Sequence, residues 1–225
     1  MALSDLVAAL ERFYGPLPAP PSDPFRYYVW EVLSAHTTPG RRDAAYAALL
    51  RIPALTPDAM VRAPRGRLTA ALAYAGPYQE QRLHALLLGV EQFRRQPAFP
   101  AIVRGPLQAA RRALGRLPRL GDGGVHRMLL FGGQHCVMPV DRDVARLALR
   151  LAGEEPARGA GATRLRPVRQ RLESGLPREE SLFRRAALYL RHHAVQTCVD
   201  DPHCAVCPLD EVCGARRGGT RARVS

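Results

Sequence analysis

The chain has 225 residues, a formal net charge of +13, a hydrophobic fraction of 47% and an aromatic fraction of 6%. This length fits one or two domains and suffices to bury a hydrophobic core. No apolar run reaches the ~20 residues of a membrane span, and no signal-peptide pattern opens the chain. We therefore expect a cytoplasmic protein without a membrane partner.

All 33 basic residues are arginine, and lysine is absent. Abundant Ala, Arg, Gly and Pro are typical of a GC-rich genome, which explains the choice of arginine over lysine but not the excess of basic over acidic residues. A pI near 10.6 in a cytosolic protein favours a polyanionic partner, with DNA or RNA as the first candidate. Without lysine, no lysine amine can form a Schiff base.

Apolar residues recur at helical spacing through most of the chain, and no stretch alternates as a strand should, so the sequence predicts an all-α fold. Asp23-Pro24 and Thr56-Pro57 are typical helix starts, with a capping residue followed by proline in the first turn. The expected helices lie before Gly15, from Pro24 to about 34, and at about 41–51, 57–63, 66–75, 78–95, 106–115, 142–152, 165–173 and 178–195. Residues 96–105 and 153–161 are expected to form loops.

The stretch from Leu117 to Asp141 reads LPRLGDGGVHRMLLFGGQHCVMPVD and predicts a tight hairpin, a helix, a short apolar run and a single acid. Gly121 stands where a tight turn favours an unhindered backbone, and Asp122 can cap the helix that follows. Exposed amides at such a turn can bind a phosphate. Taken alone, however, the pattern is more typical of an ordinary helix–helix turn without a ligand.

A C-x5-C-x2-C-x5-C motif is formed by Cys198, Cys204, Cys207 and Cys213. Four cysteines within 16 residues of a cytosolic chain are more typical of metal ligands than of disulfides. A zinc ribbon usually has two C-x-x-C pairs, whereas four thiolates suit a [4Fe-4S] cluster, so we favour the cluster over zinc. Residues 214–225 are basic and expected to be a mobile tail. Cys136 is expected to be a buried structural thiol.

The hairpin segment LPRLGDGGV, followed by VDRD, resembles the endonuclease III-like helix-hairpin-helix DNA glycosylases, whose corresponding segments read about LPGVGRKTA and VDTH. The alignment needs no gap between Leu117 and Asp141. It extends back to Leu33-Ser34-Ala35-His36-Thr37 and Ala75-Gly76-Pro77-Tyr78 and forward to the cysteines. The resemblance therefore covers nearly the whole chain.

The resemblance implies two helical lobes with a cleft between them and a C-terminal [4Fe-4S] cluster loop. One lobe would be a six-helix barrel at 23–142 that contains the hairpin (117–121). The other would be an iron–sulfur domain made of 1–22 together with 143–225. The family binds DNA across the cleft and flips the target base out of the stack, because chemistry on a stacked base is blocked.

Two positions of this chain align with the family's catalytic residues, and one of the two keeps the family's residue. Asp141 aligns with the catalytic aspartate, which stabilises positive charge on the sugar or activates water; its place at a helix start also fits a plain N-cap. Gly123 stands where bifunctional members carry the lysine that leads to strand cleavage. Asp143 replaces the family's histidine, and its charge beside Asp141 can raise the pKa of one of the two acids.

The expected DNA contacts come from three places. In the hairpin they are Arg119, which replaces the family's first glycine, with Leu120 and Gly121. His36 aligns with a polar residue that fills the gap left by the flipped base, and Pro77, followed by Tyr78, aligns with an apolar wedge. The alternatives are a distorted hairpin, a helix-end histidine and a loop proline.

These features predict a base excision repair DNA glycosylase that flips and excises a damaged or mispaired base. Water would be the nucleophile, assisted by Asp141, and Schiff-base lyase activity would be absent. The expected partner is double-stranded DNA with a damaged base or abasic site, bound by a nucleoid-associated monomer that carries a [4Fe-4S] cluster. The main alternative is a catalytically weak or inactive DNA-damage-binding protein of the same fold. A zinc-bearing nucleic-acid module is a third reading.

Overall fold

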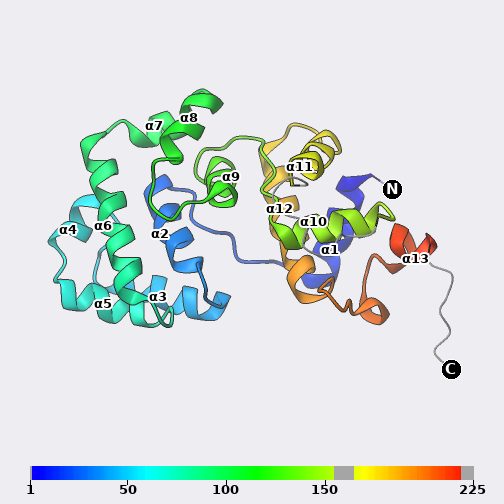
Figure 1. Cartoon of the computed structure of the whole chain (residues 1–225), viewed down its shortest axis with the longest axis horizontal. Helices are drawn as coiled ribbons and strands as arrows, with labels where there is room; N and C mark the ends of the chain where they lie inside the picture. Colours follow the sequence, from blue (N-terminus) through cyan, green and yellow to red (C-terminus); the bar gives the residue numbers. More distant parts are fainter. Residues whose placement is uncertain (1, 155–164, 219–225) are drawn as a thin grey trace. The chain divides into compact units, whose positions relative to one another are not determined.

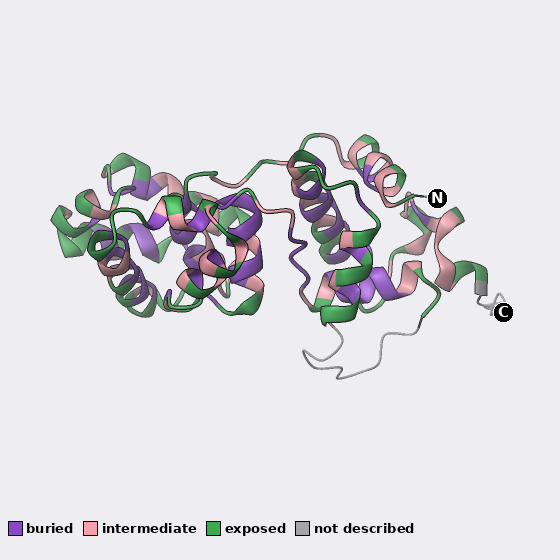
Figure 2. Cartoon of the chain, turned by 90° about the horizontal axis from the view of Figure 1, so that it is seen from above, coloured by how far each residue is buried: buried purple, intermediate pink, exposed green. Residues whose placement is uncertain are grey.

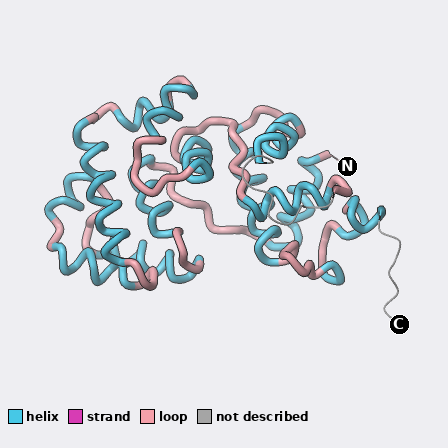
Figure 3. Tube along the Cα trace, viewed as in Figure 1, coloured by secondary structure: helices cyan, strands magenta, loops and turns pink. Residues whose placement is uncertain are grey.

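The computed structural model describes residues 2–154 and 165–218, in which helices and loops are found but no strand (Figures 1 and 3). The all-α prediction is confirmed. The helices are α1 (Leu3–Tyr14), α2 (Pro24–Ser34), α3 (Pro39–Arg51), α4 (Pro57–Arg62), α5 (Arg65–Ala73), α6 (Gln79–Arg95), α7 (Phe99–Arg104), α8 (Leu107–Leu114), α9 (Asp122–Phe131), α10 (Arg142–Leu151), α11 (Leu165–Ser174), α12 (Glu180–Gln196), the 3₁₀ turns η2 (Cys204–Val206) and η3 (Asp210–Val212), and α13 (Gly214–Gly218).

The chain divides into two compact units. The middle unit, Pro20–His135, contains α2 to α9, and the terminal unit, Met1–Ala19 with Cys136–Ser225, contains α1 and α10 to α13. The boundaries expected from the sequence were 22/23 and 142/143. The difference places the run that leads into Asp141 in the terminal unit, whereas the hairpin belongs to the middle unit.

Helix α2 is the core of the middle unit and contacts α3, α6, α7 and α9. Asp23 caps its start by accepting a hydrogen bond from the Arg26 amide, as the sequence predicts. Figure 2 shows buried residues gathered on the inner sides of the helices, and those of α2 are Pro24, Phe25, Tyr27, Tyr28, Val29, Val32 and Leu33. The Tyr28 hydroxyl donates to the carbonyl oxygens of Ala85 in α6 (2.7 Å) and Pro118 in the hairpin (3.3 Å), so one side chain of α2 joins α6 to the hairpin.

The close packing of α2 on α6 depends on Gly89. A Cβ at this position would overlap two ring atoms of Tyr28 and its hydroxyl oxygen. Since Tyr28 is fully buried and its hydroxyl is hydrogen-bonded, the ring cannot move aside cheaply. Glycine is therefore required here by the approach of a neighbouring side chain.

In the terminal unit, α12 packs on α1 and α10, and α10 also packs on α11. Val7 and Leu10 of α1 are fully buried. The Tyr189 hydroxyl of α12 donates to the carbonyl of Gly15 at 2.8 Å, which fixes the end of α1. The N-terminal helix is thus part of this unit's core.

Three sequence expectations need correction. Residues 96–105 contain α7, because Phe99 and Val103 are buried and Phe99 packs on Phe93 with ring centroids 4.5 Å apart. The segment 214–225, expected to be a mobile tail, begins with helix α13, in which Arg216 is ion-paired with Asp210. The rest of this segment, 219–225, lies outside the described residues, as does most of the expected loop 153–161. Cys136 is half-buried, with a pKa raised by that burial.

None of the helices in the described ranges has the length and apolar character needed to cross a bilayer.

We expect Gly89→Ala to lower the free energy of unfolding by about 1–3 kcal/mol, the usual cost of overpacking a core. Urea denaturation of the two proteins measures this difference. Gly66→Ala is the matched control, because a Cβ at Gly66 meets nothing within 4 Å and alanine is the better helix former. Equal stability of Gly89→Ala and Gly66→Ala would contradict the packing described here.

Candidate functional site

The hairpin between α8 and α9 turns at Arg119 and not at Gly121. Arg119 has a φ of 59°, in the left-handed region, whereas Gly121 has a φ of −57° and is the N-cap of α9. Asp122 is the first residue of the helix and not its cap; its carboxylate lies 3.4 Å from Nδ1 of His126. The strained position therefore falls on an arginine whose side chain is exposed at the tip of the hairpin.

Leu120, by contrast, is only 6% exposed. A Cβ on Gly124 would lie 2.8 Å from Leu120 Cδ1, so the leucine packs against the start of α9. Its side chain anchors the hairpin inside the unit. Of the expected hairpin contacts, only Arg119 and Gly121 are exposed to solvent.

The position of the family's lysine lies beside an ion pair that sequence reasoning missed. A Cβ on Gly123 would lie 3.4 Å from Nη1 of Arg127, and one on Gly124 3.1 Å from Oε1 of Glu31. Arg127 Nε donates to both carboxylate oxygens of Glu31 at 3.1 and 3.0 Å, and the Glu31 side chain is only 11% exposed. The signal in the sequence is an acid within the apolar run Val29-Trp30-Glu31-Val32-Leu33.

The plug and wedge candidates lie together in the middle unit. His36 follows α2 and Tyr78 immediately precedes α6; both are exposed, and their ring centroids are 6.2 Å apart. Both backbones are left-handed, with φ of 51° at His36 and 75° at Tyr78. Tyr78 is 53% exposed, and Pro77 beside it is exposed too.

Arg82 connects these two loops from within the protein. It is 2% exposed. Its guanidinium donates to the carbonyl oxygens of Ala35 (2.7 Å), Gly76 (3.4 Å) and Pro77. Burial lowers the pKa of Arg82, and the positive charge of Arg119 lowers it further, so the hairpin tip is also within electrostatic range. The middle unit thus brings the hairpin and the loops of His36 and Tyr78 close to one buried arginine.

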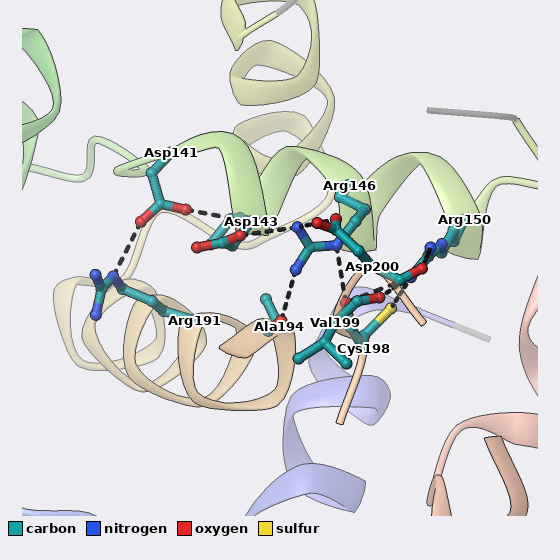
Figure 4. Close-up of polar contacts among 10 residues, drawn as sticks. Asp141, Asp143, Arg146, Arg150, Arg191, Ala194, Cys198, Val199 and Asp200 are labelled. Carbon is teal, nitrogen blue, oxygen red and sulfur yellow. Dashed lines mark hydrogen bonds and ion pairs between the residues drawn. The ribbon is translucent and has the colours of Figure 1, made fainter. Parts of the chain in front are cut away.

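Asp141 lies in the terminal unit and is the N-cap of α10. One carboxylate oxygen accepts a hydrogen bond from the Val144 amide at 3.0 Å. The other accepts from Nε of Arg191 at 3.0 Å (Figure 4). The side chain is 25% exposed. The cap and the ion pair fix both oxygens as acceptors, and the exposed Arg191 on α12 shields one of them.

The Asp143 carboxylate, two residues after Asp141, has a different ion-pair partner. It is paired with Nη1 of Arg146 at 2.8 Å, and Arg146 is buried (Figure 4). Arg146 also donates to the carbonyls of Ala194 and Cys198, both at 2.9 Å, and to the Asp200 carboxylate at 3.1 Å. The aspartate that replaces the family's histidine therefore serves as the counter-ion of a buried arginine.

The motif cysteines follow α12, around η2 and η3, and all four are free thiols. Burial raises the pKa of Cys207 to about 11. The hydrogen bond from the Leu209 amide lowers this pKa, and the charges of the other three cysteines, Cys198, Cys204 and Cys213, raise it. The four sulfurs are thus close enough for their charges to interact. Within the described ranges, however, no three His, Cys, Asp or Glu side chains are arranged to hold a single metal ion.

Hydrogen-bond donors point at the sulfurs, which suits thiolates bound to iron. Arg150 Nη1 lies 3.5 Å from the Cys198 sulfur, and the Leu209 amide lies 3.4 Å from that of Cys207. In a [4Fe-4S] cluster each thiolate binds a different iron, so the sulfurs are spread more widely than around one zinc ion with ~2.3 Å bonds. The donor set and the loop geometry fit the cluster.

A second contact to the cysteines comes from α12 and α1. Nε2 of His193 lies 3.6 Å from the Cys207 sulfur, and Nδ1 lies 2.7 Å from the Tyr14 hydroxyl. The Tyr14 hydroxyl is also 2.6 Å from that of Thr197. Burial lowers the pKa of His193 to about 4, with a smaller effect of His192, so the imidazole is neutral near pH 7. When the neutral imidazole carries its proton on Nε2, it can donate to the Cys207 sulfur, and Nδ1 then accepts a hydrogen bond from the Tyr14 hydroxyl.

Neither the protein-family models nor the curated proteins compared with this sequence give a match. Solved structures do. A thermostable thymine-DNA glycosylase superposes with a TM-score of 0.72 at 17% identity, covering 96% of this chain and 97% of its own. A non-covalent endonuclease III–DNA complex gives 0.71 at 18%, covering 97% and 99%. The H. pylori 3-methyladenine DNA glycosylase bound to 1,N6-ethenoadenine gives 0.66 at 14%, covering 87% and 98%. The chain therefore has the fold of the helix-hairpin-helix DNA glycosylases.

Proposed function

We propose that this protein is a DNA glycosylase of base excision repair that flips a damaged or mispaired base and removes it by hydrolysis. The observation that carries the proposal is the grouping of Arg119, His36 and Tyr78 in the middle unit, on a fold shared with three DNA glycosylases. The net charge of +13 supplies the attraction to DNA.

The exposed groups of the middle unit would contact different parts of the DNA. The guanidinium of Arg119 at the hairpin tip binds backbone phosphate, and the amides at the start of α9 face the same anion. Tyr78 presents an exposed aromatic face for stacking in the duplex, and His36 supplies hydrogen bonds to the base left without a partner. Stacking offsets the free energy spent on extruding a nucleotide.

Removal of the base breaks the bond between the sugar C1′ and the base nitrogen, and the bonding electrons leave with the base. The Asp141 carboxylate stabilises the positive charge that develops on the sugar and accepts a proton from the attacking water. Arg191 and the Val144 amide hold this carboxylate in one orientation. Since Gly123 has no amine and the chain has no lysine, water is the nucleophile and the strand stays intact.

The four motif cysteines would each hold one iron of a [4Fe-4S] cluster, which when bound ties the loop after α12 into a fixed shape. Arg150 already links this loop to α10 by donating to the carbonyls of Val199 (2.6 Å) and Asp200 (2.8 Å). Arg216 and Arg217 lie on α13 directly after the motif, where they can face DNA phosphates.

One observation favours a second candidate function, a damage-binding protein without efficient chemistry. Both oxygens of Asp141 already have partners, as a plain helix cap would. Asp143 and Gly123 also depart from the family's residues. The DNA-contacting groups of the middle unit do not depend on these positions.

The first test measures base release from duplexes that carry a G·T mismatch, 3-methyladenine, 1,N6-ethenoadenine or an oxidised pyrimidine, with heat or alkali to reveal abasic sites. We expect release from at least one duplex and a loss of about 10²-fold or more in Asp141→Asn, the usual scale for one acid–base group. Asparagine is as good an N-cap as aspartate, so folding is kept. Asp143→Asn, the same charge change two residues away, should retain release.

If wild type and Asp141→Asn release base equally and very slowly while both still bind DNA, the enzyme proposal is wrong and the damage-binding function is supported. A covalent adduct trapped by borohydride would contradict the water mechanism.

The second test uses Arg119→Gly and Arg119→Ala. Both remove a cation from the hairpin tip and should weaken binding to duplex DNA, with the slope of log affinity against log salt reduced by about 1. Glycine also relieves the left-handed backbone, whereas alanine retains it, so Arg119→Gly should be the more stable variant by up to ~1 kcal/mol in urea denaturation. An unchanged salt slope argues against a phosphate contact, and equal stabilities argue against the strained turn.

The third test concerns the cluster. Protein purified without oxygen should be brown and contain iron and acid-labile sulfide in equal amounts. Cys204→Ala should lose most of both, while Cys136→Ala, outside the motif, should keep them. A colourless protein with one tightly bound zinc ion would contradict the iron–sulfur proposal.

A further inference from the structure

Arg82 is a buried cation whose hydrogen bonds go to main-chain carbonyls. Arginine is seldom fully buried without an acidic partner. Among the residues that the structure describes, this guanidinium donates hydrogen bonds to the carbonyl oxygens of Ala35, Gly76 and Pro77. Its Nε atom is buried without a hydrogen-bond partner. The position therefore carries an electrostatic cost that the protein fold alone does not explain.

Two of the three carbonyls that Arg82 binds lie directly before the two strained residues. The Ala35 carbonyl belongs to the peptide group that joins Ala35 to His36, and the Pro77 carbonyl to the group that joins Pro77 to Tyr78. His36 and Tyr78 both have left-handed backbones, which residues with a Cβ rarely adopt. Charge-assisted hydrogen bonds to these peptide groups hold them in that orientation.

The two side chains so held are the exposed rings of the site. Their centroids are 6.2 Å apart and their planes are inclined by 60°. The two rings are therefore neighbours that can enter one gap in the duplex, Tyr78 by stacking on a base and His36 by hydrogen bonding. A planar guanidinium with five donors can bind both loops at once, whereas an ammonium group cannot match that geometry.

We propose that Arg82 is a positioning residue that holds His36 and Tyr78 as one rigid pair for insertion into the duplex. The inference rests on the proposed function, since it concerns the flipping step. Arg82 is too deeply buried to touch DNA itself and acts through the two loops. Its removal should spare the first encounter with DNA, which depends on exposed cations such as Arg119, and impair the distortion that follows.

The test uses a duplex with 2-aminopurine next to a stable abasic-site analogue, because the fluorescence of this base rises when it unstacks. Wild-type protein should raise the fluorescence on binding. Arg82→Met should bind with an affinity within about 3-fold of wild type but lose most of the fluorescence rise. Arg82→Lys should restore little of it. Arg94→Met is the control: Arg94 is on the same helix and its guanidinium is exposed and paired with Asp58.

A double-mutant cycle separates positioning from a general structural role. In the background His36→Gly/Tyr78→Gly, where both rings and the backbone strain are removed, Arg82→Met should cause no further loss of fluorescence or affinity. A full fluorescence rise in Arg82→Met overturns the inference. If that variant does not fold, a wild-type rise in Arg82→Lys overturns it equally. No rise with wild-type protein overturns the proposed function and, with it, this role.

Discussion

Guanidinium groups inside the protein hold the loops that carry its candidate site residues. In the middle unit Arg82 binds three carbonyls of the loops before His36 and Tyr78. In the terminal unit Arg146 binds the carbonyls of Ala194 and Cys198 together with two carboxylates. A planar fork with five donors can connect several acceptors that a single ammonium group cannot reach together. The all-arginine composition thus has a structural use beyond net charge.

This use of arginine explains why the residues that depart from the family's pattern are compatible with the fold. Asp143 compensates the charge of Arg146, so a carboxylate is favoured at that position. Arg119 accepts a strained backbone and places a cation at the hairpin tip. Gly123 has no side chain, and a Cβ there would only contact Arg127 of the Arg127–Glu31 ion pair. The helices that flank these three positions, α8, α9 and α10, are formed in spite of the departures.

Much of the fold could be predicted from the sequence because its signals are local. Helical periodicity, the caps at Asp23 and Thr56, and the cysteine spacing are each set within a few residues. The resemblance in the segment from Leu117 to Asp141 also located the hairpin and the acid. Helix α7 was missed because its stability comes from the contact of Phe99 with Phe93, which periodicity over six residues does not reveal.

The interactions that shape the candidate site could not be predicted, because they join residues far apart in the chain. Arg82 and Ala35 are 47 positions apart, and Asp141 and Arg191 are 50 apart. Nothing in the sequence near Arg82 indicates that its side chain turns inward, and nothing near Asp141 indicates its arginine. Left-handed φ at Arg119 was equally hidden, since the pattern suggested that Gly121 would take the turn.

The central claim is that the site removes a base and leaves the strand whole. Mass spectrometry of one single-turnover reaction on a damaged duplex tests it most directly, because it detects the free base and the strand together. We predict free base in amounts that match an uncleaved strand with an abasic sugar. Free base accompanied by a cleaved strand, or no free base from any of the damaged duplexes despite tight binding, would contradict this account.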